Sequence, residues 1–460
     1  MTRSGEAWIK FLLTRIAGLV IDSAVLSAAY FAAFLLRFDF IEPRWGWGTV
    51  AHSFATVLVV HIVSMLVCGC YRMSWRRTRL VDVPWYVIAA AIACFAMTAL
   101  RYFTPVETFM HLRPPYSITL ISFVLAAVGL VSWRALWTWC SRFFVREEVL
   151  IERSTMKMDC SSVIRFLRGK TVMVTGAGGS IGSEIVRQVA SASPAKILMV
   201  ERGENALYQI DREMRRLGSE AEIKALMVDV NDLGRMEEIF KAHHPDVVLH
   251  AAAYKHVPMV EMNPEEGWRN NTEATRHLAE LAAIHGVKRF VLISTDKAVN
   301  PISVMGKTKR AAEQAIMELN SPAPQHPNAQ TSFCAVRFGN VLGSSGSVVP
   351  LFKEQIEKRL PVTVTHPGMK RYFMTVHEAV GLVLQAASRN EKAIYTLDMG
   401  KPVSILDLAE NMIRQAGYKP YVDIPIVFTG IRPGEKLMEE LDVSDKSCYK
   451  TDMAKIYITK

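Results

Sequence analysis

Cysteine is scarce in this chain, with seven cysteines among 460 residues. The number is odd, and the two closest cysteines, Cys68 and Cys70, lie in an apolar stretch without a matching second pair. A disulfide framework needs paired cysteines, and a zinc site needs clustered ligands. We therefore predict no disulfide framework and no metal site. Internal repeats and low-complexity tracts are also absent, so nothing indicates a repeat architecture.

Acidic residues are fewer than basic ones, and the formal net charge is +10. Such an excess can indicate a nucleic-acid-binding protein. However, residues 1–150 hold fourteen Lys and Arg against eight Asp and Glu, much of this excess beside apolar stretches. Anionic lipid headgroups explain that part more simply. We therefore predict a lipid bilayer as a partner and no nucleic acid.

Long apolar runs are confined to the first third of the chain, and none follows Arg146. Four runs are close to the roughly 20 residues that cross a bilayer. They predict a four-helix transmembrane domain at 1–146, a linker at 147–169 and a catalytic domain at 170–460. Buried helices of a soluble protein are the alternative reading. The runs are 17–36, 52–71, 83–100 and 117–139.

Basic residues predict the orientation of these spans. Arginines cluster at 72–79, between the second and third runs, and Arg142 and Arg146 follow the fourth. Because cytoplasmic loops carry the excess of Lys and Arg, we expect the N-terminus and the catalytic domain to be cytoplasmic. Asp22 and Arg134 fall within or near the spans, where a charge needs a partner or must snorkel. Helix packing and a functional role are both open for them.

A glycine-rich turn opens the soluble part, in "KTVMVTGAGGSIGSEIVRQVA". An apolar β-branched strand at 171–175 precedes the turn, and a helix begins near Ser180. Small residues let the backbone approach a pyrophosphate, whose charge is met by the helix N-terminus. A tight strand-to-helix turn alone would produce the same spacing. The candidate cofactor-binding residues here are Gly176, Gly179, Ser180, Ile181 and Gly182.

Alternating strands and helices after this turn predict an α/β fold with a Rossmann-type, doubly wound parallel sheet. The second strand, 195–202, ends at Glu201, where a carboxylate can accept hydrogen bonds from the adenosine ribose. This favours NAD over NADP, although the neighbouring Arg202 is a residue type that can hold a 2′-phosphate. Further strands in "LMVDVND" and "DVVLHAAAYKHVP" add candidates beside the adenine, Asp229 and Val230, and beside the centre of the cofactor, Ala251 and Ala252.

Seven segments in order carry a family resemblance: "TGAGGSIGSE", "HAAAYKHVPMVE", "STDKAVNP", "VMGKTKRAAE", "RFGNVLGSSGSVVP", "RYFMTVHEA" and "RPGEKLMEEL". Together they resemble the membrane-bound polysaccharide-biosynthesis dehydratases of the extended short-chain dehydrogenase/reductase (SDR) superfamily, which act on UDP-N-acetylglucosamine. The resemblance covers nearly all of 165–445. It implies an NAD-dependent 4,6-dehydratase (a hydro-lyase) for cell-surface glycans in the bacterial inner membrane, with a UDP-N-acetylhexosamine substrate. A homodimer or higher homo-oligomer is also implied.

Two departures from the family stand out. Full-length members usually carry an additional Rossmann-like domain between the membrane helices and the catalytic domain, but Arg146 and Lys170 are separated here by only a short segment. We expect that intermediate domain to be absent. The sequence also stops soon after "RPGEKLMEEL".

The reaction assigns roles to "STDK", which follows a fifth strand, "RFVLIS". Nicotinamide takes hydride from C4 and returns it to C6, and in between the C5 proton and the C6 hydroxyl must leave. The expected catalytic residues are Thr295, Asp296 as the acid for C6, and Lys297 as the base at C5. The adjacent opposite charges of Asp296 and Lys297 favour ionisation of both, so desolvation must outweigh their attraction, or their roles are exchanged.

Met305 stands where most relatives in the superfamily carry the tyrosine of a Tyr-x-x-x-Lys motif. A thioether cannot exchange a proton, whereas Lys309 can still contact the nicotinamide ribose. Three readings compete: an inactive nucleotide-sugar-binding membrane scaffold, an epimerase that lost its activity, or a dehydratase subfamily with methionine here. We favour the third, with Thr295 and Asp296 relaying the C4 proton.

A smaller C-terminal lobe is expected to hold the nucleotide sugar. Arginines suit a diphosphate because their planar donors can bind two oxygens at once. Surface salt bridges are the alternative for each charged residue. The candidate substrate-binding residues are Lys255, Met305, Asn340, Arg371, Arg432 and Glu435.

Overall fold

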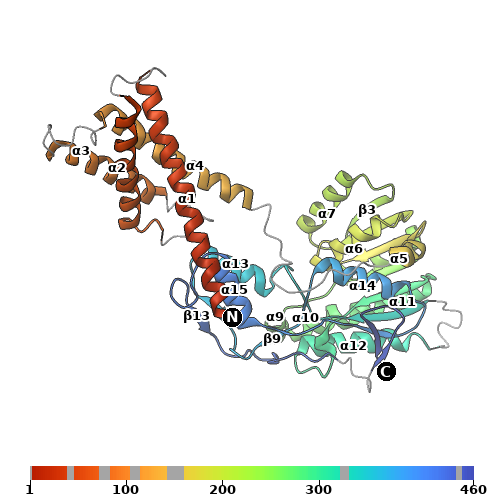
Figure 1. Ribbon diagram of the computed structural model, residues 1–460. Coiled ribbons are helices and arrows are strands. Elements are labelled where there is room, and N and C mark those ends of the chain that lie inside the picture. Colours follow the sequence, from red (N-terminus) through yellow and green to blue (C-terminus); the bar gives the residue numbers. More distant parts are fainter. Residues whose placement is uncertain are drawn as a thin grey trace. The chain divides into compact units, whose positions relative to one another are not determined.

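The computed structural model describes residues 3–38, 46–71, 83–103, 114–141, 160–321, 331–441 and 448–459. The chain divides into two compact units (Figure 1). One comprises Met1–Arg146 and Ile413–Lys419, and the other Glu147–Met412 and Pro420–Lys460. The loop arginines at 72–79, Arg142, Arg146 and most of the predicted linker lie outside the described residues, so the predicted orientation stays a prediction.

The first unit is helical and contains α1 (Arg3–Arg37), α2 (Gly46–Val67), α3 (Val83–Phe103) and α4 (Tyr116–Ser141). Three apolar stretches, Ala17–Arg37, Val83–Phe103 and Tyr116–Leu136, are long enough to cross a membrane. The described side chains of α2 give only a shorter apolar stretch, Ser53–Val67. At 1.5 Å per residue this stretch falls short of a hydrocarbon core of about 30 Å. The structure therefore supports three of the four predicted spans by length, and the second remains a prediction.

Asp22 and Arg134 form a buried ion pair between α1 and α4. The Arg134 Nη2 to Asp22 Oδ2 distance is 2.7 Å, and Trp133 Nε1 donates to Asp22 Oδ1 at 3.2 Å. The guanidinium also lies over the Tyr86 ring, 4.2 Å from its centroid. Each charge thus has an opposite charge as its partner, which is the arrangement that makes ionisable residues tolerable inside a bilayer. This geometry favours helix packing as the role of both residues.

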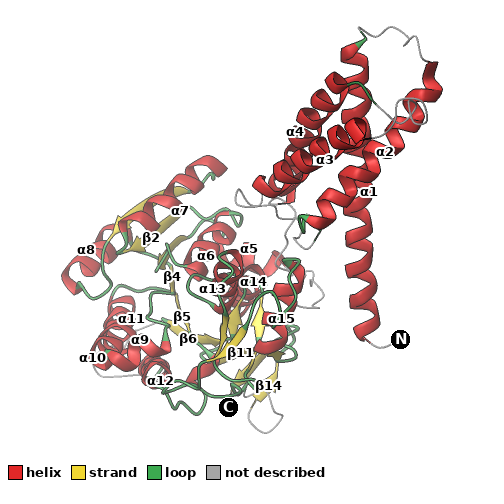
Figure 2. Cartoon of the chain, turned by 90° about the vertical axis from the view of Figure 1, so that its left-hand side faces the viewer, coloured by secondary structure: helices red, strands yellow, loops and turns green. Residues whose placement is uncertain are grey.

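A large, mostly parallel sheet forms the centre of the second unit (Figure 2). Seven neighbouring strands, from β3 to β11, run parallel, and β15 and β14 are added antiparallel at one edge. From β1, the chain adds β2 and β3 on one side of the sheet and then β4, β5 and β6 on the other side. This reversal is typical of doubly wound folds. Within the described residues the order is β14 (Cys448–Lys450), β15 (Ile456–Thr459), β11 (Ile394–Leu397), β6 (Ser332–Arg337), β5 (Arg289–Ile293), β4 (Val247–His250), β1 (Thr171–Thr175), β2 (Lys196–Glu201) and β3 (Glu222–Met227).

Alternate residues of the central strands pack against two helical layers. Val172 and Val174 of β1 belong to one apolar core, and Met173 between them belongs to the other. Both cores are apolar because a parallel strand is covered on both faces. One core includes α5 (Cys160–Leu167), α6 (Ser180–Ala190), α7 (Glu204–Leu217) and α14 (Val376–Ser388). The other includes α8 (Leu233–His243), α11 (Ala274–Ile284) and α12 (Val304–Glu318).

Shorter elements follow the strands; α9, α10, η5 and η6 contact α11 or α12 of the sheet domain, and the others form the smaller lobe. Their pairing is local: β7 with β10, β9 with β12, and β8 with β13. These elements are α9 (Val257–Met262), α10 (Pro264–Trp268), the π-helix η5 (Arg269–Glu273), the 3₁₀-helix η6 (Asp296–Ala298), β7 (Asn340–Val341), α13 (Val348–Glu357), β8 (Val362–Val364), β9 (Lys370–Arg371), β10 (Phe373–Met374), β12 (Val403–Ser404), α15 (Ile405–Gln415) and β13 (Ile426–Phe428).

The predicted fold class is confirmed. The strand at 171–175 coincides with β1, the helix expected near Ser180 begins at that residue, and the strand at 195–202 contains β2. The third strand, β3, ends at Met227, before Asp229.

Candidate active site

The turn between β1 and α6 requires glycine at two of its three spaced positions. Gly176 has a φ of +66°, and a Cβ there would lie 2.7 Å from Ala252 N. A Cβ on Gly182 would lie 1.9 Å from the carbonyl oxygen of Gly176. Gly179 is less constrained, since its nearest neighbour would be 3.3 Å away. The close packing brings the N-terminus of α6 against the end of β1, as a pyrophosphate site needs.

Eight of the predicted cofactor residues line one pocket. The pocket lies at the carboxyl ends of β1, β2 and β4, where this fold binds ligands. Tyr254 and Asn270 also line it and were not predicted. Ser180 lies outside this lining, with its Oγ accepting a hydrogen bond from Ser345 N, and Ile181 packs against the core. The eight residues are Gly176, Gly179, Glu201, Arg202, Asp229, Val230, Ala251 and Ala252.

The carboxylate of Glu201 is held by two backbone amides. Gly178 N donates to Oε2 at 3.1 Å, and Gly203 N donates to Oε1 at 2.9 Å. Each carboxylate oxygen has two lone pairs, so each retains capacity to accept from a ligand hydroxyl. The amides fix the carboxylate at the pocket wall.

Arg202 contacts two other residues of the same pocket, Tyr254 and Asp229. Its Nη1 donates to the Tyr254 hydroxyl at 2.8 Å, its guanidinium lies 4.8 Å from the centroid of that ring, and it is 3.6 Å from Asp229 Oδ2. Burial alone would raise the pKa of Asp229, but hydrogen bonds from Asn231 and the charge of Arg202 hold it below its usual value. A phosphate at this position would therefore compete with the carboxylate of Asp229.

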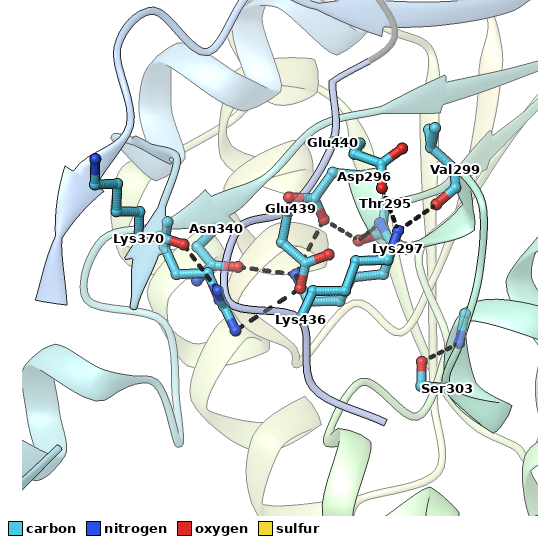
Figure 3. A network of polar contacts seen from close by, with 12 residues as sticks. Thr295, Asp296, Lys297, Val299, Ser303, Asn340, Lys370, Lys436, Glu439 and Glu440 are labelled. Carbon is cyan, nitrogen blue, oxygen red and sulfur yellow. Dashed lines mark hydrogen bonds and ion pairs between the residues drawn. The ribbon is translucent and has the colours of Figure 1, made fainter. Parts of the chain in front are cut away.

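Thr295, Asp296 and Lys297 lie together just after β5 (Figure 3). Thr295 caps η6 by accepting from Lys297 N, and its hydroxyl donates to Asp296 Oδ1 at 2.9 Å. Lys297 Nζ donates to the same Oδ1 at 3.0 Å and to Asn340 Oδ1 at 3.2 Å. Asp296 is 1% exposed. Its second oxygen, Oδ2, has no hydrogen-bond partner in the described part of the chain. That oxygen is itself buried and lies beside Gly339, where a Cβ would be 3.1 Å from it.

Glu439 joins this cluster from the segment after the "RPGEK" turn (Figure 3). Its Oε1 is 3.7 Å from Lys297 Nζ and 3.9 Å from Arg371 Nη2. The side chain is buried, and burial, with the charge of Asp296, raises its pKa against the opposing effect of Lys297. Sequence reasoning missed this residue. The one signal was its place in "RPGEKLMEEL", where Glu439 and Glu440 are indistinguishable by pattern.

Lys309 on α12 is buried, with 5% of its surface exposed, and its Nζ donates to the carbonyl oxygen of Ile293 at 2.7 Å. Burial lowers its pKa to about 8, although Glu313 acts in the opposite direction. Behind it, His250 bonds to the hydroxyls of Thr175 and Thr275 at 2.7 and 2.9 Å. His250 is thus a packed core residue.

Met305 is 3% exposed and packs in an apolar cluster with Val257 and Val260 of α9. Its side chain therefore fills space between α12 and α9. Its carbonyl oxygen accepts from the Thr308 hydroxyl at 2.8 Å.

Three predicted substrate residues lie outside the contact network of the cluster. Lys255 and Arg432 are exposed, and neither forms a hydrogen bond or ion pair with Asp296 or Lys297 among the described residues. Glu435 is partly buried, and its Oε2 has no hydrogen-bond partner in the same part of the chain. Asn340 and Arg371, by contrast, reach the cluster through Lys297 and Glu439.

The fold and the position of the pocket are those of a Rossmann-type α/β protein. The chain matches the family described as "Polysaccharide biosynthesis protein" over residues 172–460, and it belongs to that family.

Three relatives illustrate the range of the family. The chain is 50% identical over 318 residues to the probable polysaccharide biosynthesis protein EpsC of Bacillus subtilis, covering 69% of this chain and 52% of EpsC. It is 33% identical over 283 residues to a UDP-N-acetylglucosamine 4,6-dehydratase (inverting) of Campylobacter jejuni, covering 61% of this chain and 79% of that protein. It is 31% identical over 288 residues to a UDP-glucose 4-epimerase of Rickettsia canadensis, covering 63% and 82%. The chain thus spans about half the length of EpsC.

Solved structures resemble the second unit. Pen from Bacillus thuringiensis matches with a TM-score of 0.58 and 31% identity, covering 64% of this chain and 87% of Pen. DesIV, a dTDP-glucose 4,6-dehydratase of Streptomyces venezuelae solved as a double mutant with NAD and DAU bound, matches with a TM-score of 0.51 and 19% identity, covering 59% and 88%. At that identity the second likeness shows the fold alone.

Proposed function

We propose that the chain catalyses the NAD-dependent 4,6-dehydration of a UDP-N-acetylhexosamine, with UDP-N-acetylglucosamine as the expected substrate, for cell-surface polysaccharide synthesis. The observation that carries the proposal is the buried Asp296, with one unpartnered oxygen, bonded to Lys297 at the carboxyl edge of the sheet. Dehydration needs an acid and a base at neighbouring carbons of one sugar, and this pair supplies both.

The cofactor proposed for the pocket is NAD. Gly176, Gly179 and Gly182 would admit the pyrophosphate, and Glu201 would accept from the adenosine ribose. Arg202 already contacts Asp229, so a 2′-phosphate would meet a neighbouring carboxylate. When bound, the nicotinamide supplies a reversible hydride store for C4 oxidation and C6 reduction. The fold shared with DesIV, which was solved with NAD, is consistent with this assignment.

Under this proposal the side chains have the following roles. Thr295 and Asp296 relay the proton of the C4 hydroxyl, since the threonine hydroxyl donates to the carboxylate. Lys297 removes the C5 proton, and Asp296 then protonates the departing C6 oxygen. Lys309 contacts the nicotinamide ribose. Asn340 and Arg371 contact the nucleotide sugar from the smaller lobe, as do Lys255, Arg432 and Glu435.

Anchoring in the bacterial cytoplasmic membrane completes the proposal, with the N-terminus and the catalytic domain in the cytoplasm. The apolar helices of the first unit support membrane association. Cytoplasmic placement of the catalytic domain gives access to UDP-sugars.

One mass-spectrometric assay tests the reaction. The full chain in detergent is incubated with UDP-N-acetylglucosamine and NAD, and a product lighter by one water is expected. The Rickettsia relative makes an epimerase the second candidate, and this would give an isomer of unchanged mass. Absence of any conversion would favour a nucleotide-sugar-binding scaffold and would refute the proposal.

Replacement of Lys297 tests the role at C5. Lys297→Ala is expected to abolish solvent deuterium exchange at C5, because no other amine contacts Asp296 among the described residues. Exchange is measured by mass spectrometry in deuterated water. Turnover at the wild-type rate in this variant would remove Lys297 from the mechanism.

A further inference from the structure

Two buried carboxyl groups share one lysine in the proposed catalytic cluster. Asp296 Oδ1 is 3.0 Å from Lys297 Nζ, and Glu439 Oε1 lies 3.7 Å from the same nitrogen. The exposed fractions of Asp296 and Glu439 are 1% and 4%. Only the shorter contact, between Asp296 and Lys297, is a hydrogen bond. Glu439 lies near the lysine without a hydrogen bond to it.

A difficulty arises if Lys297 has only Asp296 as a partner. The lysine must be neutral to take the C5 proton, and Asp296 must be protonated to expel the C6 hydroxyl. If Asp296 has already received the proton of the C4 hydroxyl, it cannot also accept the proton of the lysine. A second acceptor is then required.

We infer that Glu439 is a positioning residue that takes the proton of the Lys297 ammonium before C5 is attacked and returns it later. This inference depends on the proposed 4,6-dehydration. The geometry allows it because Glu439 is the second carboxyl at the lysine and lies within a small side-chain movement of hydrogen-bond distance. Burial of Glu439 disfavours its charged form, since a carboxylate loses hydration inside the protein.

The protons balance through the cycle. Asp296 receives the C4 hydroxyl proton, and Glu439 receives one proton from Lys297. Neutral Lys297 then takes the C5 proton while Asp296 gives its proton to the C6 oxygen, and the C5–H and C6–O bonds break as water leaves. When hydride returns to C6, Lys297 returns its proton to C5 and regains one from Glu439. All three residues end in their starting charge states, and the water contains the original C4 hydroxyl proton.

The charged surroundings of Glu439 suit this exchange. Lys297, Asp296, Arg371 and Lys436 act on it. Burial is the largest influence and raises its pKa, which brings the carboxyl closer to a protonated state than an exposed glutamate. Arg371 lies 3.9 Å from Oε1, so it compensates the charge without donating a hydrogen bond within 3.5 Å.

Glu439→Gln tests the inference, because glutamine keeps the size of the side chain but cannot accept the proton. Formation of reduced nicotinamide from the substrate, followed by absorbance, is expected to persist. Solvent deuterium exchange at C5 should fall by about a hundredfold or more, as for loss of acid–base assistance. Exchange should recover as the pH is raised, since hydroxide can then deprotonate Lys297.

Glu440→Gln is the matched control. Glu440 is the adjacent exposed acid, bonded to Lys436 and Asn300, and its replacement should leave C5 exchange unchanged. Glu439→Asp retains a carboxyl and should restore part of the exchange lost in Glu439→Gln.

Wild-type exchange in Glu439→Gln would overturn the inference. So would equal loss of nicotinamide reduction and C5 exchange in both Glu439 variants, because that pattern indicates a structural role. If the wild-type chain forms no dehydrated product, the proposed function itself fails. If it does form the product and Glu439→Gln exchanges C5 normally, only the role of Glu439 fails.

Discussion

Replacement of Lys309 by methionine gives a measurable change in the pH dependence of stability. The side chain is buried, and burial lowers its pKa from 10.5 to about 8. In the unfolded chain the lysine has its ordinary value, so between these two pH values the unfolded state binds more protons than the folded state. The contribution of Lys309 to the free energy of unfolding therefore rises as the pH increases from about 8 to 10.5.

The magnitude follows from the two pKa values. Between pH 7 and pH 9, the linkage relation gives a gain of about 1.3 kcal/mol in the free energy of unfolding of the wild-type chain. Lys309→Met removes the titration and should lack this gain. The variant also leaves the Ile293 carbonyl without its donor, which costs about 1–3 kcal/mol at every pH. The quantity to compare is therefore the change in the free energy of unfolding between pH 7 and pH 9, and not its absolute value at either pH.

Urea unfolding of the cofactor-free full chain in detergent, at pH 7 and pH 9, measures this difference. Contributions of other titrating groups cancel between the wild type and the variant. Lys307→Met is the matched control, because Lys307 lies on the same helix and is exposed. The same pH dependence in wild type and Lys309→Met would refute the assignment of a buried, destabilising ammonium.

Two further substitutions test the site. Gly182→Ala should weaken NAD binding at least about tenfold, since its Cβ would lie 1.9 Å from Gly176 O and overpacking costs about 1–3 kcal/mol. Gly234→Ala, whose nearest neighbour would be 3.9 Å away, should bind NAD normally, and equal affinities in calorimetry would contradict the packing argument. Met305→Tyr should still form the dehydrated product, because the proposed proton-transfer groups lie elsewhere, although a larger side chain against Val257 should lower the melting temperature. A folded Met305→Tyr without product would show that position 305 matters for the chemistry.

Local sequence patterns predicted the half of the sheet that lines the proposed cofactor pocket. The apolar strand before Gly176 and the acidic end of the next strand are short-range features, so their placement in β1 and β2 follows from the chain itself. The strands at the other edge of the sheet, beyond β6, were not predicted from such local patterns. The strands β11, β14 and β15 contain only three or four residues each, and β11 is separated from its neighbour β6 by the smaller lobe.

The cluster around Lys297 could be predicted from the sequence only in part. The adjacency of Thr295, Asp296 and Lys297 is visible in the sequence, whereas the approach of Glu439 depends on tertiary structure. Glu439 and Glu440 are neighbours without an interpretable period, yet one is 4% exposed and the other lies at the surface. The segment before Glu439 is held by tertiary pairing, since Lys370 bridges Met438 and its N–H donates to Leu437 O at 2.9 Å.

Met305 and Glu439 can be understood together under the proposed mechanism. In a Tyr-x-x-x-Lys site, the phenol can receive the C4 proton and leave the other groups free for elimination. Here the corresponding side chain is apolar and packed against α9, so Asp296 must take up that proton. Once Asp296 is occupied, the base at Lys297 needs a different acceptor for its own proton, and Glu439 is the buried carboxyl at 3.7 Å. Under the proposed mechanism, a side chain at position 305 that cannot exchange a proton thus creates the need for a second carboxyl beside Lys297.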